Sequence, residues 1–370
     1  MRLWRLAGPP LVIWAVAATS VAVAAAAFGY SPFHGATWSR WDSTHYLEIA
    51  RNGYDFFRCP PDYPFGGWCG NAGWFPAYPW LVAALHLAGL PLQGTAAAVS
   101  WLFTAATIVL LWNTFFARRI APTVLGTLVY AAWAPGQIYD YAIFPLSMLA
   151  FFTILHLWLL HRGRWIGAGL AGAVAALSYP LGVLLVPVSA AWLLLERSAG
   201  LRERLRRVVL ASGLTLAGVV VLVVDQKLET GRWNAYLLVQ DKYHHNLQNA
   251  VAATRDSLRP LVHGQPFELA KAPAWQTLAV TLAFVAVVVW AVLNRSSLDR
   301  VDALILLWAI PTWLLPLSQA AISIQRSQAA LLPLAVSLRR LPRPLLLVLI
   351  VLAVPVAVAM EKLFLEGKIV

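Results

Sequence analysis

The chain has 370 residues, of which 60% are hydrophobic and 12% are charged, about half the charged share of an ordinary soluble domain. This composition excludes a soluble globular enzyme and indicates a protein whose solvent is the bilayer. The formal net charge of +12 does not indicate nucleic-acid binding. The arginines gather in short connectors between apolar segments, as the positive-inside bias predicts, so membrane lipids with anionic headgroups are their expected contacts.

Apolar runs that reach or approach the length of a transmembrane helix recur along the chain. They cover 10–28, 96–116, 141–160, 208–224, 275–293 and 345–360. Backbone polar groups must be satisfied inside each span. We therefore predict an all-α integral membrane protein, a multispanning bundle of about 10 to 12 transmembrane helices that forms one domain over residues 1–370.

The arginine clusters predict which ends of the spans lie inside the cell. With Arg2, Arg5 and the cluster at 197–207 inside, residues 31–73 and 225–274 emerge together as two large extracytoplasmic loops. The later segments are expected to alternate in direction, over 275–293, 301–317, 328–338 and 345–360. Polar chemistry is thus expected at the outer end of the bundle.

Asp42 is the candidate catalytic residue of the first loop. It follows Trp41 and precedes an apolar-periodic stretch that predicts a short helix along the membrane face. His45 and Tyr46 stand three and four residues further on, so they share a side of that helix with Asp42. A carboxylate placed there can take a proton from an acceptor hydroxyl. Asp is equally a good helix N-cap, and the local sequence leaves both interpretations open.

Cys59 and Cys69 are the only cysteines, and both fall in the first loop. On an oxidising side of a membrane they predict a disulfide, which would stabilise by roughly 3 kcal/mol through loop closure. Their spacing, without paired histidines or a second cysteine motif, does not indicate zinc, so we predict no metal site. Neither a GxGxxG loop nor an Asp-x-Asp pair supports a nucleotide-sugar donor. The glycines at 167, 169 and 172 indicate close helix packing.

The run 40–50 with Gly53-Tyr54, followed by 74–79 (Trp-Phe-Pro-Ala-Tyr-Pro), resembles the first-loop signature of the GPI mannosyltransferase 2 family and its bacterial relatives. These are multispanning GT-C glycosyltransferases that draw a sugar from a polyprenyl-phosphate carrier. Weaker landmarks follow in the family's order at 135–139, 175–182, 230–240, Arg326 and Pro333. The chain departs from the family at 144–147, where relatives often carry an acidic stretch, at Tyr179, where they often have arginine, and at Ser327, where an aromatic residue is more usual.

The resemblance implies an inverting transfer of mannose from polyprenyl-phosphate mannose to a glycan or glycolipid acceptor. Asp42 would be the general base, and no cofactor or metal is expected. A cation should meet the leaving phosphate, and Arg326 is the first candidate because its planar fork suits phosphate. Lys242 and His244 of the second loop are further candidates for binding the donor phosphate. The expected substrate-binding residues are Trp41, His45, Tyr46, Trp74 and Phe75.

Several alternatives stay open at this stage. The carrier-linked sugar could be arabinose or glucose, and the protein could instead be a non-catalytic transporter or binding protein for lipid-linked sugars. A transporter would more naturally carry its essential charges in mid-membrane spans. Asp140, near the start of a predicted span, is a candidate second carboxylate, with a helix-start role as the alternative. The composition suits a high-GC bacterium, so we expect the plasma membrane, with the active site on the extracytoplasmic side.

Overall fold

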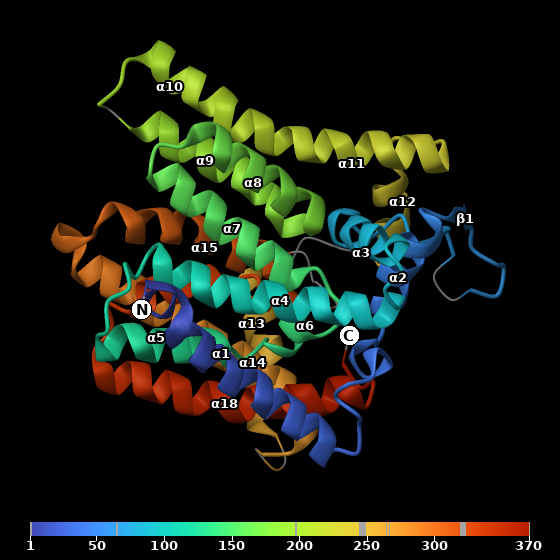
Figure 1. Cartoon of the computed structure of the whole chain (residues 1–370), viewed down its shortest axis with the longest axis horizontal. Helices are drawn as coiled ribbons and strands as arrows, with labels where there is room; N and C mark the ends of the chain where they lie inside the picture. Colours follow the sequence, from blue (N-terminus) through green and yellow to red (C-terminus); the bar gives the residue numbers. More distant parts are fainter. Residues whose placement is uncertain are drawn as a thin grey trace.

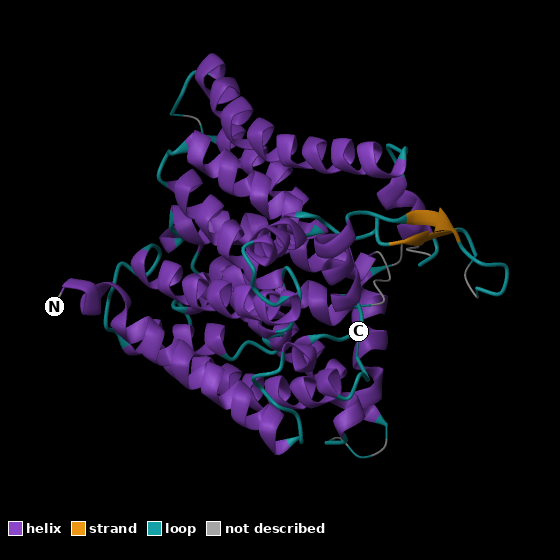
Figure 2. Ribbon diagram, turned by 45° about the vertical axis from the view of Figure 1, so that its right-hand side comes forward, coloured by secondary structure: helices purple, strands orange, loops and turns teal. Residues whose placement is uncertain are grey.

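The computed structural model describes residues 2–63, 66–196, 198–243, 249–263, 265, 267–318 and 323–369. Helices dominate this part of the chain, and its only strands are the short pair β1 (Phe56–Arg58) and β2 (Trp68–Gly70), which Figure 2 shows projecting from one end. The prediction of an all-α multispanning membrane protein is confirmed.

Six helical segments of the described chain are long and apolar enough to cross a membrane. They lie in α1 (Arg2–Ala27), α4 (Leu92–Asn113), α10 with α11 (Leu201–Thr230), α14 (Ala272–Leu293) with the 3-10 turn before it, α15 (Arg300–Ser318) and α18 (Arg343–Leu365). Shorter apolar helices lie between them, namely α3 (Ala77–Leu87), α5 (Pro122–Ala132), α7 (Leu146–His161), α8 (Trp165–Ser178) and α9 (Leu185–Leu195), which follows the 3-10 turn η2 (Pro180–Leu184).

The segment expected as an inward span at 328–338 is not one helix. It divides into the end of α16 (Ile324–Ala329), the 3-10 turn η7 (Leu332–Leu334) and α17 (Ala335–Leu338). Pro333 explains the break, because it has no backbone N–H to donate within a helix. The prediction of a single span there is wrong, and the broken segment is mostly buried in the bundle.

The helix that leads to the second loop is longer at both ends than the predicted span. α10 (Leu201–Val208) continues through a π-helical turn (Val209–Gly213) into α11 (Leu214–Thr230), and the whole runs for 30 residues. At 1.5 Å per residue it measures about 45 Å, which exceeds the roughly 30 Å of hydrocarbon. The arginine-rich segment is therefore helical and not a connector. The opposite end of the 30-residue helix carries polar residues into the second loop.

Some of the arginines expected to meet lipid headgroups have protein partners. Arg207 pairs with Glu196 at 2.9 Å and with Glu203 at 3.0 Å. Arg339 and Arg340 pair with Asp302, whose side chain is fully buried, at 2.9 and 2.8 Å. These clusters therefore also tie helices together.

Glycines allow α8 to pack closely against α11. A Cβ atom at Gly169 would collide with the backbone of Leu210, and one at Gly172 would collide with Thr215. Small residues let helix backbones approach in this way, which agrees with the packing role predicted for these glycines.

The two loops predicted to share one face do lie at the same end of the bundle. Figure 1 shows the N-terminus and α10 at one end, and α2 (Ser43–Asn52), β1 and α12 (Ala235–Asp241) at the other. The remaining short elements are η1 (Gly35–Trp38), α6 (Ile138–Tyr141), α13 (Ala250–Leu258), η4 (Arg259–Val262), η5 (Leu269–Lys271) and η6 (Arg295–Ser297).

Candidate active site

Asp42 occupies the N-cap position of α2, but its side chain accepts no hydrogen bond from that helix. The carboxylate instead forms an ion pair and hydrogen bond with Arg326 of α16, 284 residues further along the chain. The preceding residue, Trp41, has a φ of 51°, which is uncommon for a residue with a Cβ atom and is typical of strained functional sites. Capping therefore does not explain the orientation of the Asp42 carboxylate.

Arg326 is held from several sides. Its Nη2 donates to Ser323 Oγ at 2.8 Å, and its guanidinium carbon lies 5.5 Å from the centroid of the Phe144 ring. The side chains of Arg326 and Asp42 are 12% and 18% exposed, so solvent reaches the pair only narrowly. The Nε atom is buried and has no hydrogen-bond partner among the described residues.

Trp74 orients the carboxylate from the other side. Its indole donates a hydrogen bond to the Asp42 side chain, and its ring stacks on His45 with centroids 3.6 Å apart and planes at 23°. Tyr54 Oη donates to the Trp74 carbonyl oxygen at 2.9 Å. Trp74 is only 6% exposed, so two predicted substrate-binding residues, Trp74 and His45, contact each other and support the predicted base.

The surroundings shift the pKa values of Asp42 and His45. Burial alone would raise the pKa of Asp42, but the charge and hydrogen bond of Arg326 and the Trp74 indole outweigh it and hold that pKa below its usual value. Burial lowers the pKa of His45, helped by the positive charge of Lys242 and opposed by Asp42. At neutral pH the site therefore holds an ionised carboxylate beside a neutral imidazole.

The second loop clamps the segment that carries Trp74. Gln226 Nε2 donates to the Ala72 carbonyl at 2.7 Å, and Gln240 Nε2 donates to the Gly73 carbonyl at 2.9 Å. Glu229 accepts the backbone N–H of Tyr54. The sequence identified neither Gln226 nor Glu229, because the predicted span ended at 224 and the sequence alone does not show that a polar helix end reaches another loop.

The other predicted residues surround this centre in different ways. Tyr46 is 3% exposed and makes edge contacts with Tyr78 and Phe144, so it belongs to the floor of the site. Phe75 is also buried, with its ring centroid 5.3 Å from that of Tyr236. Trp41 is 46% exposed.

Of the two second-loop residues predicted to bind the donor phosphate, the structure describes Lys242 but not His244. The Lys242 ammonium lies 5.5 Å from the Tyr63 ring centroid and 5.2 Å from that of Tyr243, and the side chain is buried. His244 lies outside the described residues.

Asp140, in α6, is buried, and no hydrogen bond or ion pair joins its side chain to Asp42 or Arg326 in the described part of the chain.

A disulfide joins Cys59 to Cys69, whose Cα atoms are 5.0 Å apart. Cys69 lies on β2, opposite Phe57 of the antiparallel strand β1. The bridge closes the hairpin that precedes Trp74. Among the described residues, no group of three histidine, cysteine or acidic side chains is placed to hold a metal ion.

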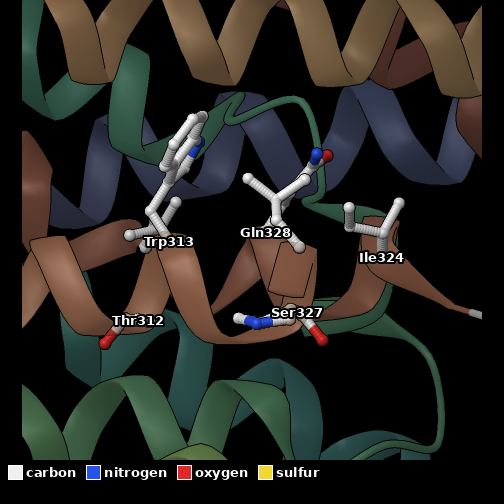
Figure 3. A pocket seen from close by; sticks show the side chains of 8 residues that line it. Thr312, Trp313, Ile324, Ser327 and Gln328 are labelled. Carbon is white, nitrogen blue, oxygen red and sulfur yellow. The ribbon is translucent and has the colours of Figure 1, made fainter. Parts of the chain in front are cut away.

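Two small pockets border α16, and Arg326 lines neither of them. The first is shown in Figure 3, and Thr312 and Trp313 of α15 line it together with Ile324, Ser327 and Gln328. The second has a mostly apolar lining from α5, the residues that follow it, α14 and the 328–335 segment. Gln328 lines both pockets, and its amide is fixed by Thr277 at 3.0 Å and Gln276 at 3.2 Å.

The chain matches no protein-family model and no curated protein. Its structure is similar to the crystal structure of the Archaeoglobus fulgidus oligosaccharyltransferase tethered to an acceptor peptide, with a TM-score of 0.51 and 12% sequence identity. The match covers 97% of this chain and 55% of that protein, so this chain spans about half of its length. At this identity the likeness shows the fold, and the predicted GT-C-like multispanning bundle is confirmed.

Proposed function

We propose that this protein is an inverting glycosyltransferase that moves mannose from polyprenyl-phosphate mannose to a hydroxyl of a glycan or glycolipid acceptor on the extracytoplasmic face. The observation that carries this proposal is the contact between Asp42 and Arg326. The resemblance assigned these residues separately as the base and the phosphate binder, and the fold brings them together from loops 284 residues apart.

The geometry supports a reaction in which the donor phosphate competes with Asp42 for the guanidinium. Phosphate accepts from an arginine fork as well as carboxylate does, so a bound donor would draw Arg326 away from Asp42. The freed carboxylate then takes the proton of the acceptor hydroxyl. The acceptor oxygen attacks the anomeric carbon while the bond from that carbon to the phosphate oxygen breaks, and Arg326 stabilises the charge that develops on the leaving lipid phosphate.

The surroundings of Arg326 suit a lipid-linked donor. The guanidinium is only narrowly open to solvent, and its carbon lies 5.5 Å from the centroid of the apolar Phe144 ring. This setting strengthens its attraction to the phosphate of a donor. The likeness to an oligosaccharyltransferase supports glycosyl transfer within a membrane. A carrier-linked arabinose or glucose donor would use the same contacts, so a donor panel decides the sugar.

The test is sugar transfer by the purified protein in nanodiscs, with synthetic polyprenyl-phosphate mannose and a panel of mannoside acceptors. Asp42→Asn should abolish detectable transfer, because the amide cannot accept the proton. The same variant should bind the donor at least as tightly as the wild type, since Arg326 then has no carboxylate competitor. Arg326→Gln should lose donor binding as well as transfer.

Asp62→Asn is the matched control, because Asp62 is an exposed carboxylate of the same loop. Donor binding separates loss of the base from general unfolding, since an unfolded Asp42→Asn protein would lose both. Equal transfer by Asp42→Asn and wild type would refute the assignment of the base. Translocation of the donor lipid without transfer to any acceptor would favour the transporter alternative instead.

A further inference from the structure

Two arginines from different loops converge on one indole ring at the outer end of the bundle. The guanidinium carbon of Arg58, on β1, lies 4.3 Å from the Trp68 ring centroid, and that of Arg232, just after α11, lies 5.1 Å from the same centroid. Phe56 stacks on Trp68 with centroids 4.3 Å apart. The stacking fixes the ring that both guanidinium groups contact, so two like charges are held near each other.

A second cation and aromatic pair continues this surface. The Lys227 ammonium lies 5.7 Å from the Trp233 ring centroid, and the Trp233 side chain is 60% exposed. We call Arg58, Trp68, Lys227, Arg232 and Trp233 together the outer cationic patch. Exposed tryptophan and arginine side chains in one place are typical of binding surfaces.

The patch keeps its charge unpaired. Within the described part of the chain, none of its three cations forms an ion pair, although other exposed arginines of the protein do. Two carboxylates of these loops have backbone partners: Glu229 accepts the N–H of Tyr54, and Asp55 accepts that of Asn71 at 2.6 Å. Two neighbouring guanidinium groups that have no acidic side chain as a partner are suited to a phosphate or carboxylate ligand.

The patch is also close to the candidate base. Trp68 precedes Trp74 by six residues, a length that spans at most ~20 Å even when fully extended, and the Trp74 indole contacts Asp42. Gln226, one residue before Lys227, holds the Ala72 carbonyl between these two tryptophans. An acceptor with a short glycan would therefore be long enough to place one end on the patch and the other end at Asp42.

We propose that the outer cationic patch binds an anionic group of the acceptor, so that the acceptor is a glycan or glycolipid whose headgroup carries phosphate or carboxylate. This inference rests on the proposed glycosyl transfer and names the acceptor class. Arg58 and Arg232 hold the anion, and Trp68 and Trp233 offer flat faces to the neighbouring sugars. The patch selects and positions the acceptor, while Asp42 and Arg326 carry out the transfer.

The experiment compares two synthetic acceptors that share their tails and sugar, a dialkylglycerol phosphomannoside and the uncharged dialkylglycerol mannoside. Binding to the full-length protein in phosphatidylcholine nanodiscs is measured without donor, so the result does not depend on transfer. The wild type should prefer the phosphate-bearing acceptor. The double variant Arg58→Gln with Arg232→Gln should weaken that binding by on the order of tenfold or more and leave the uncharged acceptor unaffected.

Arg51→Gln is the matched control, because Arg51 is an exposed arginine of the same loop that pairs with Glu48. The Arg58→Lys and Arg232→Lys pair should restore part of the binding, since charge returns without the planar fork. Equal loss of both acceptors would overturn the proposal. The proposal would also be overturned if the double variant lost binding to phosphatidylglycerol vesicles without mannose as strongly as it lost binding to the phosphate-bearing acceptor. The patch would then be a lipid anchor. If the preference and its loss are observed while no acceptor is mannosylated, the patch stands and the proposed transfer fails.

Discussion

The Asp42 and Arg326 pair predicts a specific pattern of stabilities. After Arg326→Gln, the Trp74 indole is the only native side chain that still donates a hydrogen bond to the Asp42 carboxylate. The Asp42 side chain is 18% exposed. Breaking a buried ion pair costs about 3–5 kcal/mol, and residual solvent access reduces this to about 2–3 kcal/mol. Asp42→Asn should cost less, about 1–2 kcal/mol, because Ser323 and the Phe144 ring still contact the guanidinium and the carbonyl oxygen of the introduced amide can accept its hydrogen bond.

The double variant tests whether these costs come from one interaction. Removing both charges leaves neither side chain as an unpaired ion, so the double variant should be destabilised by about 2 kcal/mol less than the sum of the single variants. The measurement is equilibrium unfolding in one detergent, followed by tryptophan fluorescence, for all four proteins. Costs that add to within about 0.5 kcal/mol would show that the residues are not coupled and would remove the basis of the proposed site.

Three further predictions address positioning, packing and pH. Trp74→Phe should keep donor binding but lower transfer about tenfold, because the ring remains while the hydrogen bond to Asp42 is lost; donor binding and initial rates check this. Gly172→Ala should destabilise by about 1–3 kcal/mol, because its Cβ would collide with Thr215, whereas Gly94→Ala, which meets open space, should not destabilise in the same unfolding assay. Because the pKa of Asp42 is lower in the folded than in the unfolded protein, its stabilisation is complete at neutral pH and should be lost as pH falls below about 4; melting temperatures of wild type and Asp42→Asn should converge there.

The architecture was largely predictable because bilayer insertion depends on composition summed over long windows. The errors occurred where a local or tertiary effect overrides that average. Pro333 divides a segment of ordinary hydropathy into short turns, and α11 continues to Thr230 because Gln226 and Glu229 find partners in the first loop. Polar residues at the end of an apolar run look like a boundary when their partners are unknown.

The sequence identified several residues that the fold brings together, but it did not show how they are arranged. Motif order identified Asp42, Trp74 and Arg326, while helical spacing placed His45 beside the carboxylate. Spacing could not show that the His45 ring stacks on Trp74, since that contact depends on how the chain returns after the hairpin. The convergence of Arg58 and Arg232 on Trp68 likewise joins two loops, and no local pattern in either loop indicates it.

The departures from the resembled family gain a physical explanation from the fold. Tyr179 stands where relatives often carry arginine, and Ser327 stands where an aromatic residue is more usual. In the structure, the Tyr179 and Ser327 side chains hydrogen-bond to each other, and Ser327 directly follows Arg326. A tyrosine at 179 and a hydroxyl at 327 therefore contact each other, in place of the arginine and the aromatic residue that relatives often carry. In the proposed mechanism, position 179 supplies no second cation for the donor phosphate, so we expect the pairing of Arg326 with Asp42 to control both donor binding and the release of the base.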